Sequence, residues 1–102
     1  MKIIAFTDVH GSLTALKRIE NKVRTQKPDL IVCAGDISIF ERGIVGLIRR
    51  LNKLKKKILI INGNHENVST FIKLSKLFKN IIFIHKKCFI QDNLLFLGYG
   101  GG

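Results

Sequence analysis

Three polar loops, each directly after a short apolar run, constrain the fold of this chain more than any other sequence feature. The same number of residues separates Asp8 from Asp36 and Asp36 from Asn64. A repeated unit of one strand and one helix produces such even spacing, and the carboxyl ends of its parallel strands lie at one sheet edge. We therefore expect carboxylate, imidazole and amide groups to meet at that edge. The loops are Asp8-Val9-His10-Gly11, Gly35-Asp36 and Gly63-Asn64-His65-Glu66.

Apolar runs and helical periodicity predict alternating strands and helices around these loops. The first strand is entirely apolar, so we expect it to be buried on both faces, as central parallel strands are. Ser12 has the side chain of a helix N-cap, and the helix after it should end at the Lys27-Pro28 step. Further helices are expected over residues 44–54 and from Val68 to Phe78. The apolar side chains of the three helices that we expect to face inward are Leu13, Leu16, Ile19, Val23, Ile44, Leu47, Ile48, Leu51, Leu54, Val68, Phe71, Ile72 and Phe78. The expected strands span residues 3–6, 30–34, 58–61, 81–84, 88–90 and 94–97.

The last two expected strands flank Gln91-Asp92-Asn93, a polar turn that predicts a β-hairpin. The predicted fold class is therefore α/β, with a mixed β-sheet flanked by helices. The chain then runs into Gly98-Tyr99-Gly100-Gly101-Gly102, which resembles the start of another loop at a site. We expect residues 1–102 to form one incomplete domain that a partner chain or a further segment completes.

Composition favours a globular protein. The chain has 102 residues, of which 46% are apolar and 25% charged, and it contains no repetitive or proline-rich stretch. Its first residues include too few apolar side chains for a signal peptide or a membrane span, so we expect a cytoplasmic protein without a membrane partner. Cys33 and Cys88 lack paired metal-ligand spacing, and we interpret both as structural.

The net charge of +11 has two interpretations that the sequence leaves open. Lysine and arginine neutralise phosphates, so the charge indicates a nucleic-acid partner. The same residues could form the solvated face of an amphipathic helix, because they alternate with Leu51 and Leu54. Aromatic residues do not interleave with the cations, as they do in single-strand binders. The cations in question are Arg49, Arg50, Lys53, Lys55, Lys56 and Lys57.

The side chains of the three loops suit a pair of divalent metal ions such as Mn²⁺, Fe²⁺, Zn²⁺ or Ni²⁺. These ions accept carboxylate oxygen, imidazole nitrogen and amide oxygen together, and two-metal hydrolases place both ions in one shared site. Asp8 and His10 can reach one ion from a single turn, Asp36 can bridge the ions, and Asn64 can supply an oxygen to the second. Glycines at positions 11, 35 and 63 allow tight turns there.

Two histidines are assigned different roles. His65 stands beside Asn64, where it could protonate a leaving oxygen, and Glu66 could orient it through a hydrogen bond. His85 follows an apolar strand and precedes two lysines, so we interpret it as a turn residue and not as a ligand. Each motif taken alone is common in ordinary turns, and only the full set at even spacing indicates a site.

Asp8-Val9-His10-Gly11, Gly35-Asp36 and Gly63-Asn64-His65-Glu66 together resemble the calcineurin-like metallophosphoesterase family, with its motifs Asp-x-His, Gly-Asp-x-x-Asp and Gly-Asn-His-Asp/Glu. The resemblance covers nearly the whole chain. It implies that Asp8, His10 and Asp36 bind one metal ion, that Asp36 and Asn64 bind a second, and that His65 is catalytic. It also implies a fold in which helices flank two mixed sheets, as an α/β/β/α sandwich.

Two departures from the family pattern matter. Ile39 stands where the family has a second aspartate, which changes a supporting contact but removes no direct ligand. The family also places a histidine and a Gly-His-x-His motif further downstream, where they complete both metal shells. The chain therefore resembles the amino-terminal half of such an enzyme, as a fragment, one subunit of a split enzyme or a degenerate copy.

Two functions from different classes follow. The first is a metal-dependent phosphoesterase that hydrolyses a phosphate monoester or diester and depends on the downstream ligands for activity. The second is a non-catalytic binding or assembly module whose basic surface contacts nucleic acid. A dinucleotide-binding domain and a P-loop are excluded, because neither glycine signature follows the first strand.

Overall fold

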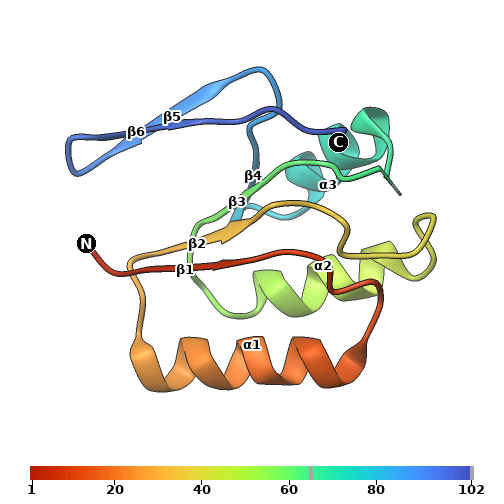
Figure 1. Cartoon of the computed structure of the whole chain (residues 1–102), viewed down its shortest axis with the longest axis horizontal. Coiled ribbons are helices and arrows are strands. Elements are labelled where there is room, and N and C mark those ends of the chain that lie inside the picture. Colours follow the sequence, from red (N-terminus) through yellow and green to blue (C-terminus); the bar gives the residue numbers. More distant parts are fainter. Residues whose placement is uncertain (65, 102) are drawn as a thin grey trace.

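The computed structural model describes residues 1–64 and 66–101, which form a parallel sheet with helices on one face and a hairpin on the other (Figure 1). The helices are α1 (Leu13–Gln26), α2 (Ile44–Asn52) and α3 (Val68–Leu77). The strands are β1 (Ile3–Phe6), β2 (Leu30–Cys33), β3 (Ile58–Ile60), β4 (Ile81–Phe83), β5 (Cys88–Gln91) and β6 (Leu94–Leu97). The first four strands pair in parallel in the order β1-β2-β3-β4, as successive strand-helix units require.

Alternate residues of the parallel strands pack into two separate cores. Side chains on one face, such as Ile31, Ile58 and Ile60, pack against the three helices and form the larger core. Side chains on the other face, such as Leu30 and Leu59, pack with the hairpin residues Phe89 and Phe96. Because successive side chains of a strand point to opposite faces of the sheet, one set packs against the helices and the other against the hairpin.

The first helix begins and ends where the sequence predicts. The Ser12 hydroxyl caps α1 by accepting a hydrogen bond from the Ala15 N–H (3.1 Å), and Lys27 ends the helix in the left-handed conformation before the buried Pro28. Of the side chains expected to face inward, Leu16 and Val23 are buried, but Leu13 is 55% exposed. Leu13 is the first residue of α1 and lines an open hollow beside Gly43 and Leu47.

The second and third helices differ in detail from the prediction. The α2 residues Ile44, Leu47, Ile48 and Leu51 are buried as expected, but the helix ends at Asn52, so the lysines from 53 to 57 lie beyond it. In α3, Phe71 is buried as expected, and Val68 and Phe78 pack against the same core, but Ile72 is exposed and Leu74 is buried instead.

Two expectations about the sheet are corrected by tertiary structure. The first strand is not buried on both faces: β1 lies at the edge of the sheet, and Ile3 and Ala5 are exposed. The predicted hairpin is present, but β5 and β6 form a two-stranded antiparallel sheet of their own. A parallel bridge joins His85, which follows β4, to Gly98, which follows β6.

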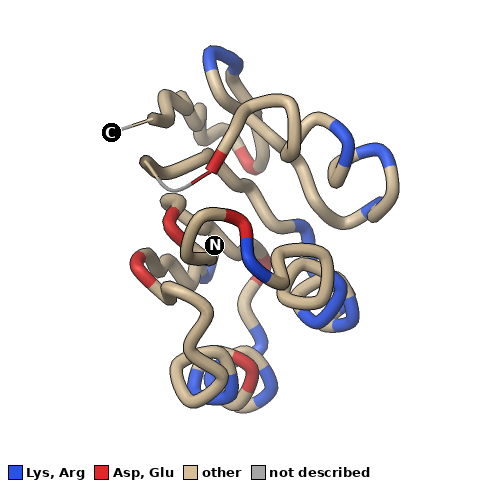
Figure 2. Tube along the Cα trace, turned by 90° about the vertical axis from the view of Figure 1, so that its right-hand side faces the viewer, with Lys and Arg blue, Asp and Glu red and all other residues tan. Residues whose placement is uncertain are grey.

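Charged residues are unevenly placed on this scaffold. Lysine and arginine lie along the helices and in several loops, whereas aspartate and glutamate gather toward the middle of the view in Figure 2. Within residues 1–64 and 66–101, no helix is both long enough and apolar enough to cross a membrane.

Candidate metal centre

The loops after β1 and β2 are joined by backbone hydrogen bonds at the carboxyl edge of the sheet. The N–H groups of His10 and Gly11 donate to the carbonyls of Asp36 (2.9 Å) and Ile37 (2.8 Å). The Asp8 N–H donates to the Gly35 carbonyl at 3.4 Å, where the two strands end. The backbone of one polar loop therefore sets the position of the other.

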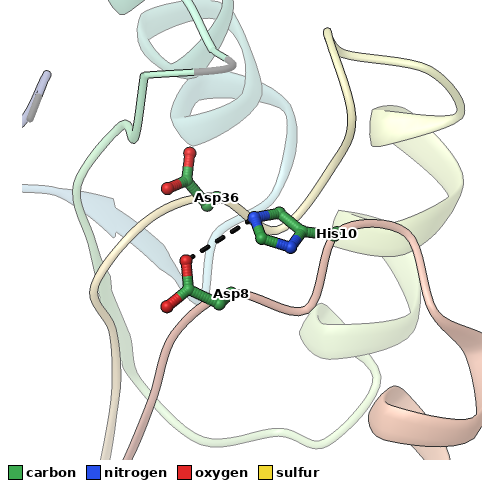
Figure 3. A group of neighbouring side chains, drawn as sticks. All are labelled: Asp8, His10 and Asp36. Atoms are coloured by element: carbon green, nitrogen blue, oxygen red, sulfur yellow. Dashed lines mark ion pairs between the residues drawn. The ribbon is translucent and has the colours of Figure 1, made fainter.

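This pairing brings Asp8, His10 and Asp36 together. One oxygen or nitrogen atom from each side chain lies within 4.8 Å of the corresponding atoms of the other two (Figure 3). His10 Nε2 lies 3.5 Å from Asp8 Oδ1, and both side chains are substantially exposed. Ligands bound to one transition-metal ion at about 2.1 Å lie at most about 4.2 Å apart, so a small contraction would let one ion bind all three. Two carboxylates and an imidazole fit Mn²⁺, Fe²⁺, Zn²⁺ or Ni²⁺.

All three residues of this group have left-handed backbone conformations. The φ angles are +59° for Asp8, +49° for His10 and +52° for Asp36. A non-glycine residue in this region costs of order 1 kcal/mol, and such residues cluster at functional sites. The three side chains that lie close together thus all come from residues with this uncommon backbone conformation.

The loops after β2 and β3 pack against each other through glycines. A Cβ atom on Gly35 would lie 2.6 Å from the Gly63 nitrogen, and a Cβ atom on Gly63 would overlap the Asp36 side chain. Gly35 also has a φ of +92°. A side chain at Gly63 would therefore displace Asp36, and a side chain at Gly35 would push the second and third loops apart.

Glu66 ties the third loop to the second. Its buried carboxylate accepts hydrogen bonds from the N–H groups of Asp36 (2.9 Å), Gly63 (3.0 Å) and Ser38 (2.8 Å), and from the Ser38 hydroxyl (2.8 Å). Ser38 is absent from the predicted site residues, although a serine between two isoleucines at 37 and 39 is the kind of buried polar residue that needs a partner.

The glycine-rich segment lies beside the third loop. The Gly101 N–H donates to the Asn62 carbonyl (2.8 Å), and the Gly100 N–H donates to His85 Nδ1 (2.8 Å). A Cβ atom on Gly100 would overlap the Asn62 side chain. His85, which we predicted to be a turn residue and not a ligand, therefore holds this segment through a hydrogen bond.

The other predicted site residues lie on the third loop. Asn64 is exposed in the turn that follows β3, and its role as a metal ligand stays a prediction. The predicted catalytic His65 lies outside the described residues, and so does its proposed hydrogen bond with Glu66.

A family model decides the classification. The model for calcineurin-like phosphoesterases matches residues 1–101. The chain belongs to this family. None of the curated proteins compared with this calcineurin-like phosphoesterase matches it.

Solved structures share the fold of this calcineurin-like phosphoesterase chain. TT1561 of Thermus thermophilus matches with a TM-score of 0.81 at 17% identity, over 97% of this chain and 48% of its own. YfcE, a phosphoesterase from E. coli, matches with a TM-score of 0.64 at 18% identity, over 93% of this chain and 54% of its own. The chain thus spans about half the length of these structures.

Proposed function

We propose that this chain forms one half of a dinuclear metal site that hydrolyses phosphate esters. The observation on which the proposal depends is the convergence of Asp8, His10 and Asp36 at the carboxyl edge of the sheet. Membership of the calcineurin-like phosphoesterase family supports the reaction class.

Each residue of the site has a distinct role in this proposal. Asp8 and His10 would hold the first ion, Asp36 would be a ligand shared with the second, and Asn64 would offer its amide oxygen to the second. Bound divalent ions of this kind activate water and neutralise the charge of a phosphoryl group. His65 donates a proton to the leaving oxygen. Glu66 keeps the second and third loops in register, so that Asp36 and Asn64 stay at one edge.

A second segment is needed to complete the site, and the outer surface of the hairpin supports this part of the proposal. Ile90, Leu95 and Leu97 are 68%, 58% and 77% exposed, and they share the hairpin face that points away from the parallel sheet. An apolar hollow of about 230 Å³ lies between the sheet and Leu97. Exposed apolar surface of this kind marks an interaction site.

Manganese binding to the 102-residue chain tests the metal site separately from catalysis. Because Asp8, His10 and Asp36 offer one ligand atom each, we expect weak but saturable Mn²⁺ binding by electron paramagnetic resonance. Asp36→Asn should abolish saturation. Asp92→Asn removes the same charge from the exposed hairpin turn and should leave binding unchanged. Equal binding by both variants would contradict the proposal.

Activity requires the completed site. We expect the chain alone to hydrolyse little p-nitrophenyl phosphate or bis-p-nitrophenyl phosphate with Mn²⁺. Mixing it with a segment that carries Gly-His-x-His and an upstream histidine should restore turnover, and preference between the two substrates would distinguish monoester from diester hydrolysis. The proposal fails if the mixture shows no metal-dependent turnover above that of the Asp36→Ala variant.

A further inference from the structure

A basic groove lies between the carboxyl ends of α1 and α2. It has a volume of about 430 Å³, and Val23 and Leu54 form its apolar lining. Because the groove residues precede β2 and β3 in the chain, the groove lies at the opposite sheet edge from the metal group. Its charged lining residues are Glu20, Arg24, Lys27, Arg50, Lys53 and Lys56.

The only carboxylate that lines the groove is already neutralised. The Arg50 guanidinium donates from Nε to Glu20 Oε2 (3.2 Å) and from Nη2 to Glu20 Oε1. No ion pair joins the other four groove cations to a carboxylate in the described part of the chain. The groove therefore presents unbalanced positive charge.

The helix ends do not account for this charge. The carboxyl end of a helix carries roughly half a negative charge, so the two ends together offset about one cation. Five cations against one carboxylate leave a clear excess after that correction. An anionic ligand would supply the missing negative charge.

The basic surface continues beyond the groove. A second hollow of about 560 Å³ shares Lys53 with the groove and is also lined by Lys55 and Lys79. These lysines lie in loops at the same sheet edge, before β3 and β4. A concave path of cations suits a linear series of phosphates better than a single small anion or a flat bilayer surface.

We propose that this groove binds the phosphate backbone of a nucleic acid with little sequence preference. Arg24, Lys27, Lys53 and Lys56 contact successive phosphates, and Lys79 extends the path. Neither hollow is lined by an aromatic side chain, so base stacking does not contribute. The site is independent of the proposed phosphoesterase reaction, because it lies at the other edge of the sheet.

Fluorescence anisotropy with a labelled single-stranded oligonucleotide of about 20 nucleotides, and with its duplex, tests the proposal on the 102-residue chain. Affinity should fall as KCl is raised from about 50 to 200 mM. The slope of the logarithm of the binding constant against the logarithm of the KCl concentration should correspond to several phosphate contacts. Lys53→Gln/Lys56→Gln should weaken binding about tenfold and flatten that slope. The matched control, Lys73→Gln/Lys76→Gln, removes two charges from α3 and should change affinity less than twofold.

A variant that keeps the fold separates binding from stability. Lys27 has a φ of +47° at the end of α1, where glycine is the preferred residue. Lys27→Gly should therefore preserve or raise the unfolding midpoint in urea while it weakens oligonucleotide binding. Asp36→Asn should bind the oligonucleotide as the original chain does, even if it loses Mn²⁺, so the two proposals can fail separately.

Three outcomes would overturn the proposal. Equal losses in the groove pair and the α3 pair would show that only net charge matters. Displacement of the oligonucleotide by pyrophosphate at equal phosphate concentration would indicate a site for small anions. Binding to vesicles of anionic phospholipid without binding to oligonucleotides would indicate a membrane surface.

Discussion

At the scale of single residues, Glu66 has the strongest influence on the candidate site. The residue is 6% exposed, and its carboxylate accepts hydrogen bonds from three backbone N–H groups and one hydroxyl. These donors belong to two different loops, so the side chain acts as a bridge between them. Burial deprives the carboxylate of its hydrogen bonds to water, and these four hydrogen bonds compensate for that loss.

Replacement of Glu66 should destabilise the chain through its unpaired donors. Glu66→Ala removes the acceptor of the buried Ser38 and Gly63 N–H groups and of the half-buried Asp36 N–H, and we expect a loss of about 3 kcal/mol in the free energy of unfolding. Ser38→Ala removes one hydroxyl and should cost about 1 kcal/mol. Urea denaturation followed by circular dichroism measures both. A loss for Glu66→Ala no larger than that for Ser38→Ala would contradict this account.

The two cysteines should differ in reactivity and in their effect on alkaline stability. Burial, with a smaller effect from the nearby charges of Glu66 and Asp36, raises the pKa of the Cys33 thiol to about 12, while Cys88 is exposed. At pH 8, Ellman's reagent should modify Cys88 readily and Cys33 only after unfolding. Because the unfolded Cys33 thiol ionises near 9.0, its contribution to stability should be complete below that pH and decline toward pH 12. Rapid labelling of Cys33 in a Cys88→Ser variant would contradict the prediction.

At the scale of elements, the site depends on how closely three strand-to-helix loops approach. Backbone hydrogen bonds join the first loop to the second, and glycine packing with the Glu66 carboxylate joins the second to the third. Short parallel strands end at the same edge, so the polar residues after them meet without long connections. The geometry of the metal group is therefore a property of loop packing.

A methyl group at Gly63 should disturb this packing. Gly63→Ala places a Cβ atom against the Asp36 carboxylate, so we expect Mn²⁺ binding to weaken at least fivefold. Gly46→Ala is the matched control: it adds the same methyl group to open space on α2 and should raise the free energy of unfolding by about 0.5–1 kcal/mol. Electron paramagnetic resonance and urea denaturation measure the two effects. Unchanged Mn²⁺ binding in Gly63→Ala would contradict the packing argument.

At the scale of the whole molecule, the two faces of the parallel sheet are covered to different extents. The helices bury one face of the parallel sheet almost completely, whereas the hairpin covers only part of the other and leaves its own outer face exposed. The structural relatives are about twice as long as this chain. The exposed hairpin face is the surface on which the segment of our proposal would pack.

Without such a partner, the 102-residue chain should self-associate through the hairpin. Leu95→Thr/Leu97→Thr keeps β-forming residues but removes apolar surface, so it should shift the chain toward monomer in sedimentation velocity at about 100 μM. Leu77→Thr, which alters an exposed leucine on α3, should not. A monomeric original chain at that concentration would contradict the expectation.

Local patterns in the sequence predicted much of this fold. Apolar runs, the Ser12 cap and the Lys27-Pro28 step placed the strands and the first helix within a few residues, because strand and helix periodicity depends on neighbours in the chain. Even spacing of the polar loops predicted the meeting of Asp8, His10 and Asp36 at one edge. The ligand role of Asn64 and the catalytic role of His65 stay predictions.

Other features were decided only by tertiary structure. The exposure of Ile3 depends on which strand lies at the sheet edge, and the separation of the hairpin depends on which strands it meets. Two of the residues that donate to the Glu66 carboxylate, Asp36 and Ser38, lie on a loop far from it in sequence. The sequence indicates that an apolar residue is to be buried or that a charged residue is to be paired. Which residue it contacts depends on how distant segments pack, and local sequence patterns carry no information about that packing.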